Sequence, residues 1–161
     1  TQGVSSAASD VYKRQVWGDV DFLILDLPPG TGDIQLTIVQ TAELDGVVVV
    51  TTPQEVALID ARKAIGLFER VKTPILGVIE NMSYFQCPSD GKIYHIFGEG
   101  GGEREAAKLG VPLLGKIPLD IATRSGGDEG RPVALEDPGQ NPVSAAFRQV
   151  AEQCARMVLD C

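Results

Sequence analysis

A run of apolar residues that ends in a carboxylate is the first stretch of this sequence whose residue types suit chemistry. The stretch reads Leu23-Ile24-Leu25-Asp26-Leu27-Pro28-Pro29-Gly30-Thr31-Gly32-Asp33. A buried strand that stops at Asp26 places that carboxylate beyond the carboxyl end of the strand, where ligands bind in open α/β sheets. Mg²⁺ in proteins is held by one or two carboxylates and water. We therefore predict that Asp26 positions Mg²⁺ through water.

The prolines and glycines after Asp26 favour a phosphate beside that ion. Pro28 and Pro29 stiffen the exit from the strand, and Gly30 and Gly32 leave backbone N–H groups open to a phosphate. The pattern is that of a Walker B strand with its switch loop. The alternative is an ordinary buried strand that ends in a turn, with Asp26 as a helix cap.

Three further motifs follow in order along the chain. They are Glu80-Asn81-Met82-Ser83-Tyr84-Phe85, Phe97-Gly98-Glu99-Gly100-Gly101-Gly102-Glu103 and Gly115-Lys116-Ile117-Pro118-Leu119-Asp120. Together with residues 26–33 they resemble the second half of the Mrp/ApbC family, the P-loop ATPases that carry iron–sulfur clusters. The resemblance runs from about Val16 to the end of the chain. It implies an α/β fold, an open and mostly parallel doubly wound sheet of the P-loop NTPase type, truncated at its N-terminus.

The resemblance also implies a nucleotide site, with ATP and Mg²⁺ as cofactors and Asp26 as the catalytic residue. The residues that it implies for nucleotide binding are Gly30, Thr31, Gly32, Asn81, Pro118 and Asp120. Gly30 would sense the γ-phosphate through its N–H, and Asn81 would contact the adenine edge. Around Pro118 and Asp120 the backbone would make most of the contacts. The alternative for Asn81 is a local turn bond.

The sequence departs from the family pattern after Cys87. The family shows Cys-Pro-x-Cys, and two subunits of a dimer supply four thiolates to a 4Fe–4S cluster. This chain has Asp90 at the second position, and carboxylate is a harder, poorer ligand for a cluster iron. Two hypotheses remain: a weaker, oxygen-sensitive site of two Cys and two Asp, or a free Cys87 in a mobile loop. His95 is interpreted as structural, because residues 94–96 alternate like an edge strand.

Alternating strands and helices must position these residues. Apolar runs predict strands at residues 22–25, 47–50, 75–79 and 113–114. Apolar residues at helical spacing predict three helices, with the stripes Ile34, Ile38 and Ala42; Ala57, Ala61, Ala64, Phe68 and Val71; and Val143, Phe147, Val150, Cys154, Met157 and Cys161. Strands separated by helices imply right-handed parallel crossovers. On the last stripe, Cys154 and Cys161 are predicted to face the core as small hydrophobes. Residues 98–102 are interpreted as a flexible glycine hinge.

Composition restricts the classes of function. The 161 residues suit one domain and carry a net charge of −8, which disfavours nucleic acid and anionic membranes as partners. The three widely spaced cysteines do not make a disulfide framework and favour a reducing, cytoplasmic setting. Residues 1–15 are interpreted as a non-native or disordered leader, and residues 16–161 as the C-terminal portion of one P-loop ATPase domain.

The sequence therefore predicts a fragment of an ATP-dependent iron–sulfur cluster carrier or assembly protein. The resemblance implies a homodimer that delivers clusters to apo iron–sulfur proteins. Gly-x-x-x-x-Gly-Lys-Ser/Thr does not occur in the sequence, so we expect this chain alone to be inactive as an ATPase. The alternatives are a non-catalytic dimerisation or partner-binding half-domain, and a septum-placing or partitioning ATPase without a cluster.

Overall fold

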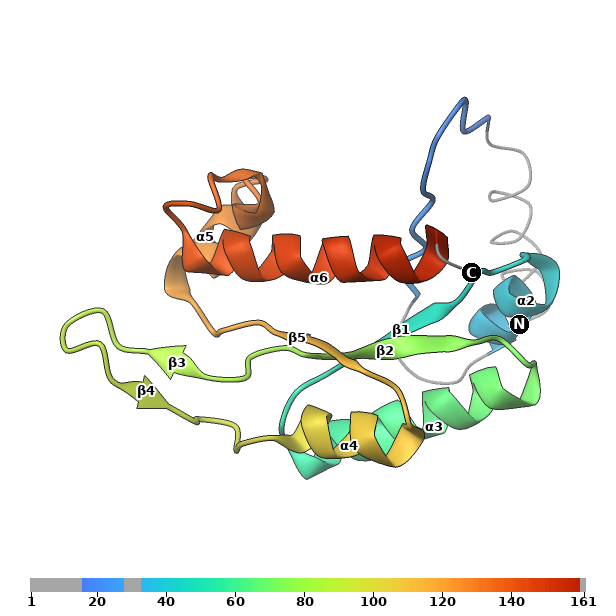
Figure 1. Ribbon diagram of the computed structural model, residues 1–161, viewed down its shortest axis with the longest axis horizontal. Helices are drawn as coiled ribbons and strands as arrows, with labels where there is room; N and C mark the ends of the chain where they lie inside the picture. The colour runs from blue at the N-terminus through green and yellow to red at the C-terminus, as the bar shows by residue number, and fades with distance from the viewer. Residues whose placement is uncertain (1–15, 28–32, 160–161) are drawn as a thin grey trace.

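The computed structural model describes residues 16–27 and 33–159, which form a three-stranded parallel sheet with helices on both faces. The sheet has the order β1-β2-β5, with β1 at Val47–Thr51, β2 at Ile75–Glu80 and β5 at Leu113–Lys116. The helices are α2 (Asp33–Thr41), α3 (Glu55–Arg70), α4 (Gly101–Leu109), α5 (Ile121–Asp128), the 3-10 turn η1 (Val133–Leu135) and α6 (Pro142–Leu159). A two-stranded antiparallel hairpin, β3 (Phe85–Gln86) and β4 (Ile93–Tyr94), projects from one end of the sheet (Figure 1).

Two apolar layers hold the sheet between its helices. Helices α3 and α4 lie along one face, and α6 lies along the other (Figure 1). Val78, which is fully buried, packs toward the α3 and α4 layer, whereas its neighbour Ile79 packs with Val150 of α6. This alternation is the period of two that places successive strand residues on opposite faces. The predicted α/β fold class with a parallel sheet is confirmed.

The strand register brings the carboxyl ends of all three strands to one edge. Thr51 pairs with Glu80, and Glu80 pairs with Lys116, so the last residues of β1, β2 and β5 are neighbours. Gly77 permits the close approach of β2 and β5, because a Cβ there would lie 2.7 Å from the carbonyl oxygen of Pro112. In the part of the chain described, no strand pairs with the outer edge of β1, and Val50 on that strand is 59% exposed.

The first predicted strand is wrong. Residues 22–25 run as irregular chain, and the side chain of Ile24 is 89% exposed. An apolar run becomes a strand only when a neighbouring strand satisfies its backbone hydrogen bonds. The predicted sheet of at least four strands is therefore observed as three. The remaining strand predictions, at residues 47–50, 75–79 and 113–114, are confirmed by β1, β2 and β5.

The helix predictions are confirmed in position, with differences in the buried face. Phe147, predicted on the apolar stripe of α6, is exposed, and Ser144 is buried instead. On α3 the buried residues are Leu58, Ala61, Ile65 and Phe68, a stripe turned slightly from the predicted one. Cys154 of α6 is half-buried against the cluster that contains Val150, as expected of a small hydrophobe. The predicted counterpart Cys161 lies outside the described residues.

The glycine-rich segment at residues 98–102 leads into a tightly packed helix start. Gly98 and Gly100 precede the helix with positive φ, and the interpretation of the segment as a flexible hinge stays a prediction. Gly101 and Gly102 are buried in the first turn of α4. A Cβ on Gly101 would lie 2.4 Å from the carbonyl oxygen of Pro53, and one on Gly102 would lie 2.9 Å from Cβ of Glu80. At Gly101 and Gly102, glycine is required because the helix start and the strand ends approach closely.

Candidate functional site at the carboxyl edge of the sheet

The segments that leave β2 and β5 are joined by backbone hydrogen bonds. The N–H of Ser83 donates to the carbonyl oxygen of Ile117 at 2.9 Å, and the N–H of Leu119 donates to that of Tyr84 at 2.7 Å. The N–H of Asn81 donates to the carbonyl oxygen of Thr51 at 2.7 Å, which ties in the end of β1. The structure therefore brings together two segments that the sequence predicted for adenine, around Asn81 and at residues 118–120.

Asn81 is half-buried and makes the local turn bond that the alternative hypothesis required. Its Oδ1 accepts from the N–H of Met82 at 2.9 Å. Met82 has φ of 53°, a left-handed conformation that is uncommon for a residue with a long side chain. The Nδ2 group of Asn81 has no partner among the residues the structure describes, so it can still donate to a ligand. Both interpretations of Asn81 are compatible with this geometry.

Asp120 serves as the N-cap of α5, a role that was not predicted. Its Oδ2 accepts from the N–H of Thr123 at 2.7 Å and from Oγ1 of the same residue at 2.8 Å. A capping carboxylate satisfies one of the free N–H groups of a first helical turn. Because the Asp120 carboxylate is engaged in this way, a ligand at this loop would meet mainly the backbone around Pro118.

The predicted magnesium residue lies away from regular structure. Asp26 is exposed in the irregular segment that replaces the predicted strand. Gly30, Thr31 and Gly32 lie outside the described residues. The phosphate and magnesium half of the site therefore stays a prediction.

Glu80 is a central residue of this edge that the sequence analysis quoted only within a motif. It is fully buried, its Oε1 accepts from Oγ of Ser83 at 2.5 Å, and its Oε2 accepts from the N–H of Gly102 at 2.6 Å. Two donors thus satisfy a carboxylate that would otherwise be costly to bury. A signal was available, because Glu80 ends an apolar strand in the same manner in which Asp26 was expected to end one.

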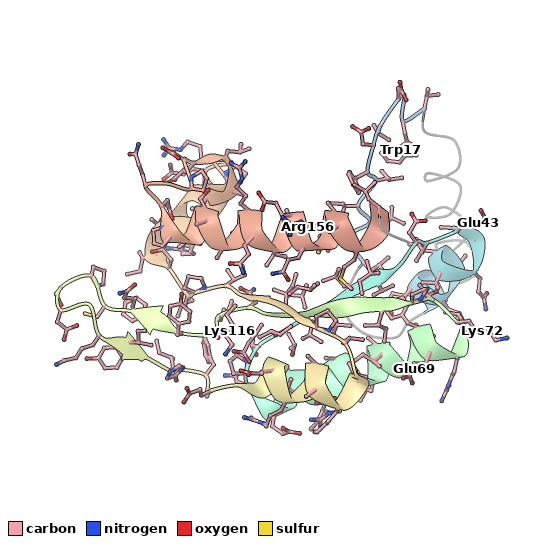
Figure 2. All side chains as sticks on the ribbon, in the orientation of Figure 1. Trp17, Glu43, Glu69, Lys72, Lys116 and Arg156 are labelled. Atoms are coloured by element: carbon pink, nitrogen blue, oxygen red, sulfur yellow. The ribbon has the colours of Figure 1, made fainter. Side chains whose placement is uncertain are left out.

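An ion pair joins β5 to the first turn of α4. Nζ of Lys116 lies 2.9 Å from Oε2 of Glu103, and Lys116 sits near the base of the hairpin (Figure 2). The hydrogen bond between them raises the pKa of Lys116 and lowers the pKa of Glu103. Both groups therefore remain charged at neutral pH and help fix α4 to the edge.

Cys87 directly follows β3 and begins the hairpin tip, which we define as residues 87–92. Its N–H donates to the carbonyl oxygen of Lys92 at 2.9 Å, and its Sγ lies 3.0 Å from Oγ of Ser89. The Ser89 hydroxyl is the main cause that lowers the pKa of the Cys87 thiol. Oδ1 of Asp90 accepts from the N–H of Lys92 at 3.0 Å, and this bond lowers the pKa of Asp90.

The tip carries a soft and a hard ligand side by side. Cys87 is half-buried and Asp90 is exposed. No group of three or more His, Cys, Asp or Glu side chains arranged to hold a metal ion occurs among the described residues. His95 follows β4 instead of lying within it, and its Nε2 is 3.6 Å from Oε1 of Glu99. One tip alone thus offers at most a partial ligand set, to which a second copy would have to add.

Comparison with known protein families places the fold in context. Residues 2–155 match the family model ParA, described as NUBPL iron-transfer P-loop NTPase. This chain belongs to that family. The match begins within residues 1–15, which the structure does not describe, so the interpretation of those residues as a leader stays a prediction.

Named relatives of this P-loop NTPase family share close to half of its residues. The iron–sulfur cluster carrier protein of Pyrococcus furiosus is 48% identical over 150 residues, which are 93% of this chain and 50% of that protein. The iron–sulfur protein required for NADH dehydrogenase, mitochondrial, of Arabidopsis thaliana is 47% identical over 153 residues, 95% of this chain and 49% of that protein. The chain thus spans about half the length of these curated relatives.

Solved structures of P-loop proteins resemble the observed fold. A nucleotide-binding protein of Archaeoglobus fulgidus, solved in complex with ADP and with cobalt, matches with a TM-score of 0.71 and 41% identity, over 80% of this chain and 53% of that one. The cell division ATPase MinD of Pyrococcus furiosus matches with a TM-score of 0.67 and 27% identity, over 95% of this chain and 59% of that one. None of the helices described is long and apolar enough to cross a membrane.

Proposed function

We propose that this chain is the nucleotide-edge and cluster-bearing portion of an ATP-dependent iron–sulfur cluster carrier. The observation that carries the proposal is the pair of backbone hydrogen bonds, Ser83 to Ile117 and Leu119 to Tyr84, that makes one surface from two adenine-side segments. The cluster-carrier names of relatives at 47–48% identity support the cargo, and the ADP in the Archaeoglobus neighbour supports the nucleotide.

In this proposal one part of the sheet edge contacts the base of the nucleotide and another part contacts its phosphates. Asn81 donates Nδ2 to the base, and the backbone around Pro118 lies against the ring. Asp26 holds Mg²⁺ through water, and the loop with Gly30, Thr31 and Gly32 lies along the phosphates. Phosphoryl transfer needs a P-loop lysine to stabilise the charge on the phosphates. We therefore expect this chain by itself to bind Mg–ATP weakly and not to hydrolyse it.

The cluster is cargo that the hairpin tips of two copies would share. A closed dimer has twofold symmetry, so the tip of one subunit faces its own counterpart across the axis. Two Cys87 thiolates and two Asp90 carboxylates would then surround the cluster, and apo iron–sulfur proteins would accept it. A carboxylate in place of thiolate weakens this site. We place the protein in a reducing, cytoplasm-like compartment, noting that one relative is named mitochondrial.

Anaerobic reconstitution with ferrous iron and sulfide tests the cargo. We expect visible cluster absorbance that Cys87→Ser abolishes and that Asp90→Cys strengthens, because the latter restores a soft ligand. Cys154→Ser is the matched control, since Cys154 is packed against the core and should leave iron binding unchanged. If neither wild type nor Asp90→Cys binds iron, the cluster part of the proposal is wrong. If only Asp90→Cys binds, the natural tip has lost the carrier role.

A further inference from the structure

The buried carboxylate of Glu80 connects two parts of the molecule that the proposed function requires to act together. Its Oε1 is bonded to Ser83 in the segment that leaves β2, and its Oε2 is bonded to Gly102 in the first turn of α4. Asn81 lies between Glu80 and Ser83 in the chain. Helix α4 follows the β3–β4 hairpin, so one side chain bonds both to the edge and to the element that ends the hairpin segment.

Both ends of the hairpin segment are anchored at the carboxyl edge of the sheet. At its start, Phe85 forms an isolated bridge with Leu119. At its end, Gly101 packs against the backbone of Pro53 so closely that no Cβ could be accommodated. Residues 87–96 between these anchors are half-buried or exposed. The position of the hairpin is therefore set by how α4 and the exit of β2 are fixed to the edge.

The bonds of Glu80 to Ser83 and to Gly102 link the exit of β2 to the first turn of α4, and we call this link the joint. A carboxylate suits the joint better than a neutral side chain would. Glu80 brings negative charge to the N-terminus of α4, where the helix dipole favours an anion. Hydrogen bonds to a charged acceptor are shorter and stronger than bonds between neutral groups. Glutamine has the same shape but supplies one acceptor oxygen and one amide donor, so it cannot accept from both Ser83 and Gly102 with separate oxygens.

We propose that Glu80 is a positioning residue that fixes the Cys87 hairpin relative to the Asn81 edge, so that the two predicted binding regions are mechanically coupled. The proposal rests on the proposed function for its purpose, but it is a statement about this fold. Displacement of the β2 exit would pull on the Glu80 carboxylate, move the first turn of α4 and shift the end of the hairpin. The predicted base contact and the predicted cluster ligand thereby share one joint.

Hydrogen exchange and site-resolved alkylation of the full chain test this joint without nucleotide or iron. In Glu80→Gln we expect exchange at Gly102 and in the hairpin segment, residues 85–97, to rise about tenfold or more, because a bond to a charged group is lost. The alkylation rate of Cys87 should change with it. The matched control is Glu69→Gln, which makes the same change at an exposed carboxylate near the end of α3, away from α4 and the hairpin, and should leave hairpin exchange within about twofold of wild type.

A purely structural role for Glu80 predicts a different result. Leu114→Ala, which removes a side chain that is 1% exposed, lowers global stability without touching the joint. If Glu80→Gln raises exchange in β1 and the hairpin equally, as Leu114→Ala should, or raises it at Gly102 alone, the proposal is overturned. Should Glu80→Gln fail to fold, Ser83→Ala removes one donor with the backbone intact and must loosen the hairpin. Absence of iron binding would refute the cargo and leave this result standing.

Discussion

The carboxyl edge of the sheet and the hairpin tip are both candidate binding regions, yet they are built in opposite ways. At the edge, Glu80 bonds to Gly102 and Asn81 bonds to Thr51, so each contact joins residues that are far apart in the chain. At the tip, the hydrogen bonds of Cys87, Ser89, Asp90 and Lys92 that the structure describes stay within residues 87–92. The edge is buried around Glu80, whereas most of the tip is exposed.

Because of this difference, substitutions at the edge and at the tip should disturb the structure to different extents. A substitution at the edge disturbs three strand ends and a helix start together. A substitution at the tip disturbs a short loop whose hydrogen bonds are local. The presence of Asp90 where the resembled family has its second cysteine is therefore compatible with an intact fold, and in the proposed function it changes only the ligands that the tip offers.

The largest expected difference between the two regions is in stability. Glu80→Ala leaves the Ser83 hydroxyl and the Gly102 N–H buried without an acceptor and opens a small cavity, so we expect a loss of about 3 kcal/mol or more. Asp90→Ala, which truncates an exposed carboxylate at the tip, should leave stability nearly unchanged. Urea denaturation of both variants checks this prediction. Similar losses of stability in both variants would show that the edge and the tip contribute equally to the stability of the fold.

Glycine substitutions sharpen the same comparison at the level of packing. Gly102→Ala puts a methyl group 2.9 Å from Cβ of Glu80, and we expect it to cost about 1–3 kcal/mol despite the better helix propensity of alanine. Gly66→Ala in the middle of α3 is the matched control, because no atom lies within 4 Å of the added methyl. It should stabilise the chain by about 0.5–1 kcal/mol. Thermal unfolding curves would show opposite shifts; a stabilising Gly102→Ala would contradict the close packing.

The contact between α3 and α4 predicts a smaller effect, a dependence of folding stability on pH. Arg62 bonds to both carboxylate oxygens of Glu105, and this bond lowers the pKa of Glu105 below its ordinary value of 4.5. A depressed carboxyl pKa stabilises the folded state above the unfolded value, and that stabilisation is lost as the pH falls through the folded pKa.

Stability measured from pH 7 to pH 3 should therefore decline below about pH 4.5 in wild type and decline less in Arg62→Met, which keeps the aliphatic stem but removes the charge. Asp60→Asn is the control, because it removes an exposed carboxylate of α3 outside the Arg62–Glu105 contact, and its profile should follow that of wild type. Parallel profiles for wild type and Arg62→Met would contradict the assignment of this effect to Glu105.

The smallest expected effect concerns thiol reactivity and leaves the fold unchanged. The Ser89 hydroxyl lowers the pKa of Cys87, whereas burial raises the pKa of Cys154. Because the thiolate is the nucleophile, iodoacetamide near neutral pH should modify Cys87 at least about tenfold faster than Cys154. Ser89→Ala should slow Cys87 without altering unfolding. Site-resolved mass spectrometry measures both rates, and equal rates would show that the tip does not activate its thiol.

The sequence predicts well those features that depend on neighbours in the chain. The four valines of β1 and the buried positions Val143 and Val150 of α6 needed only periodicity to be found, although Phe147 of the predicted stripe is exposed. Residues 22–25 have the same apolar character, but a strand also needs a pairing partner, which local pattern does not reveal. The hairpin was predicted only in part, because β4 ends at Tyr94 and His95 lies beyond it.

The site was predicted less completely because its decisive contacts join distant residues. The burial of Glu80 and the need for glycine at Gly101 and Gly102 arise where a helix start meets strand ends more than twenty residues away in the chain. From their glycine-rich surroundings alone, these residues were interpreted as part of a flexible hinge. Only the three-dimensional arrangement shows that they are points of close approach.

Among the described residues no strand covers the outer edge of β1, so the tendency of this chain to self-associate should rise with its concentration. An edge strand of exposed backbone N–H and carbonyl groups is a template for any extended peptide, and Val50 adds an apolar side chain to it. In dilute solution such an edge is hydrated. At high protein concentration it can pair with an edge strand of another copy, and each added copy leaves a further edge exposed. We expect the aggregated fraction of the chain to rise with protein concentration, by addition of strands to this edge and not by unfolding.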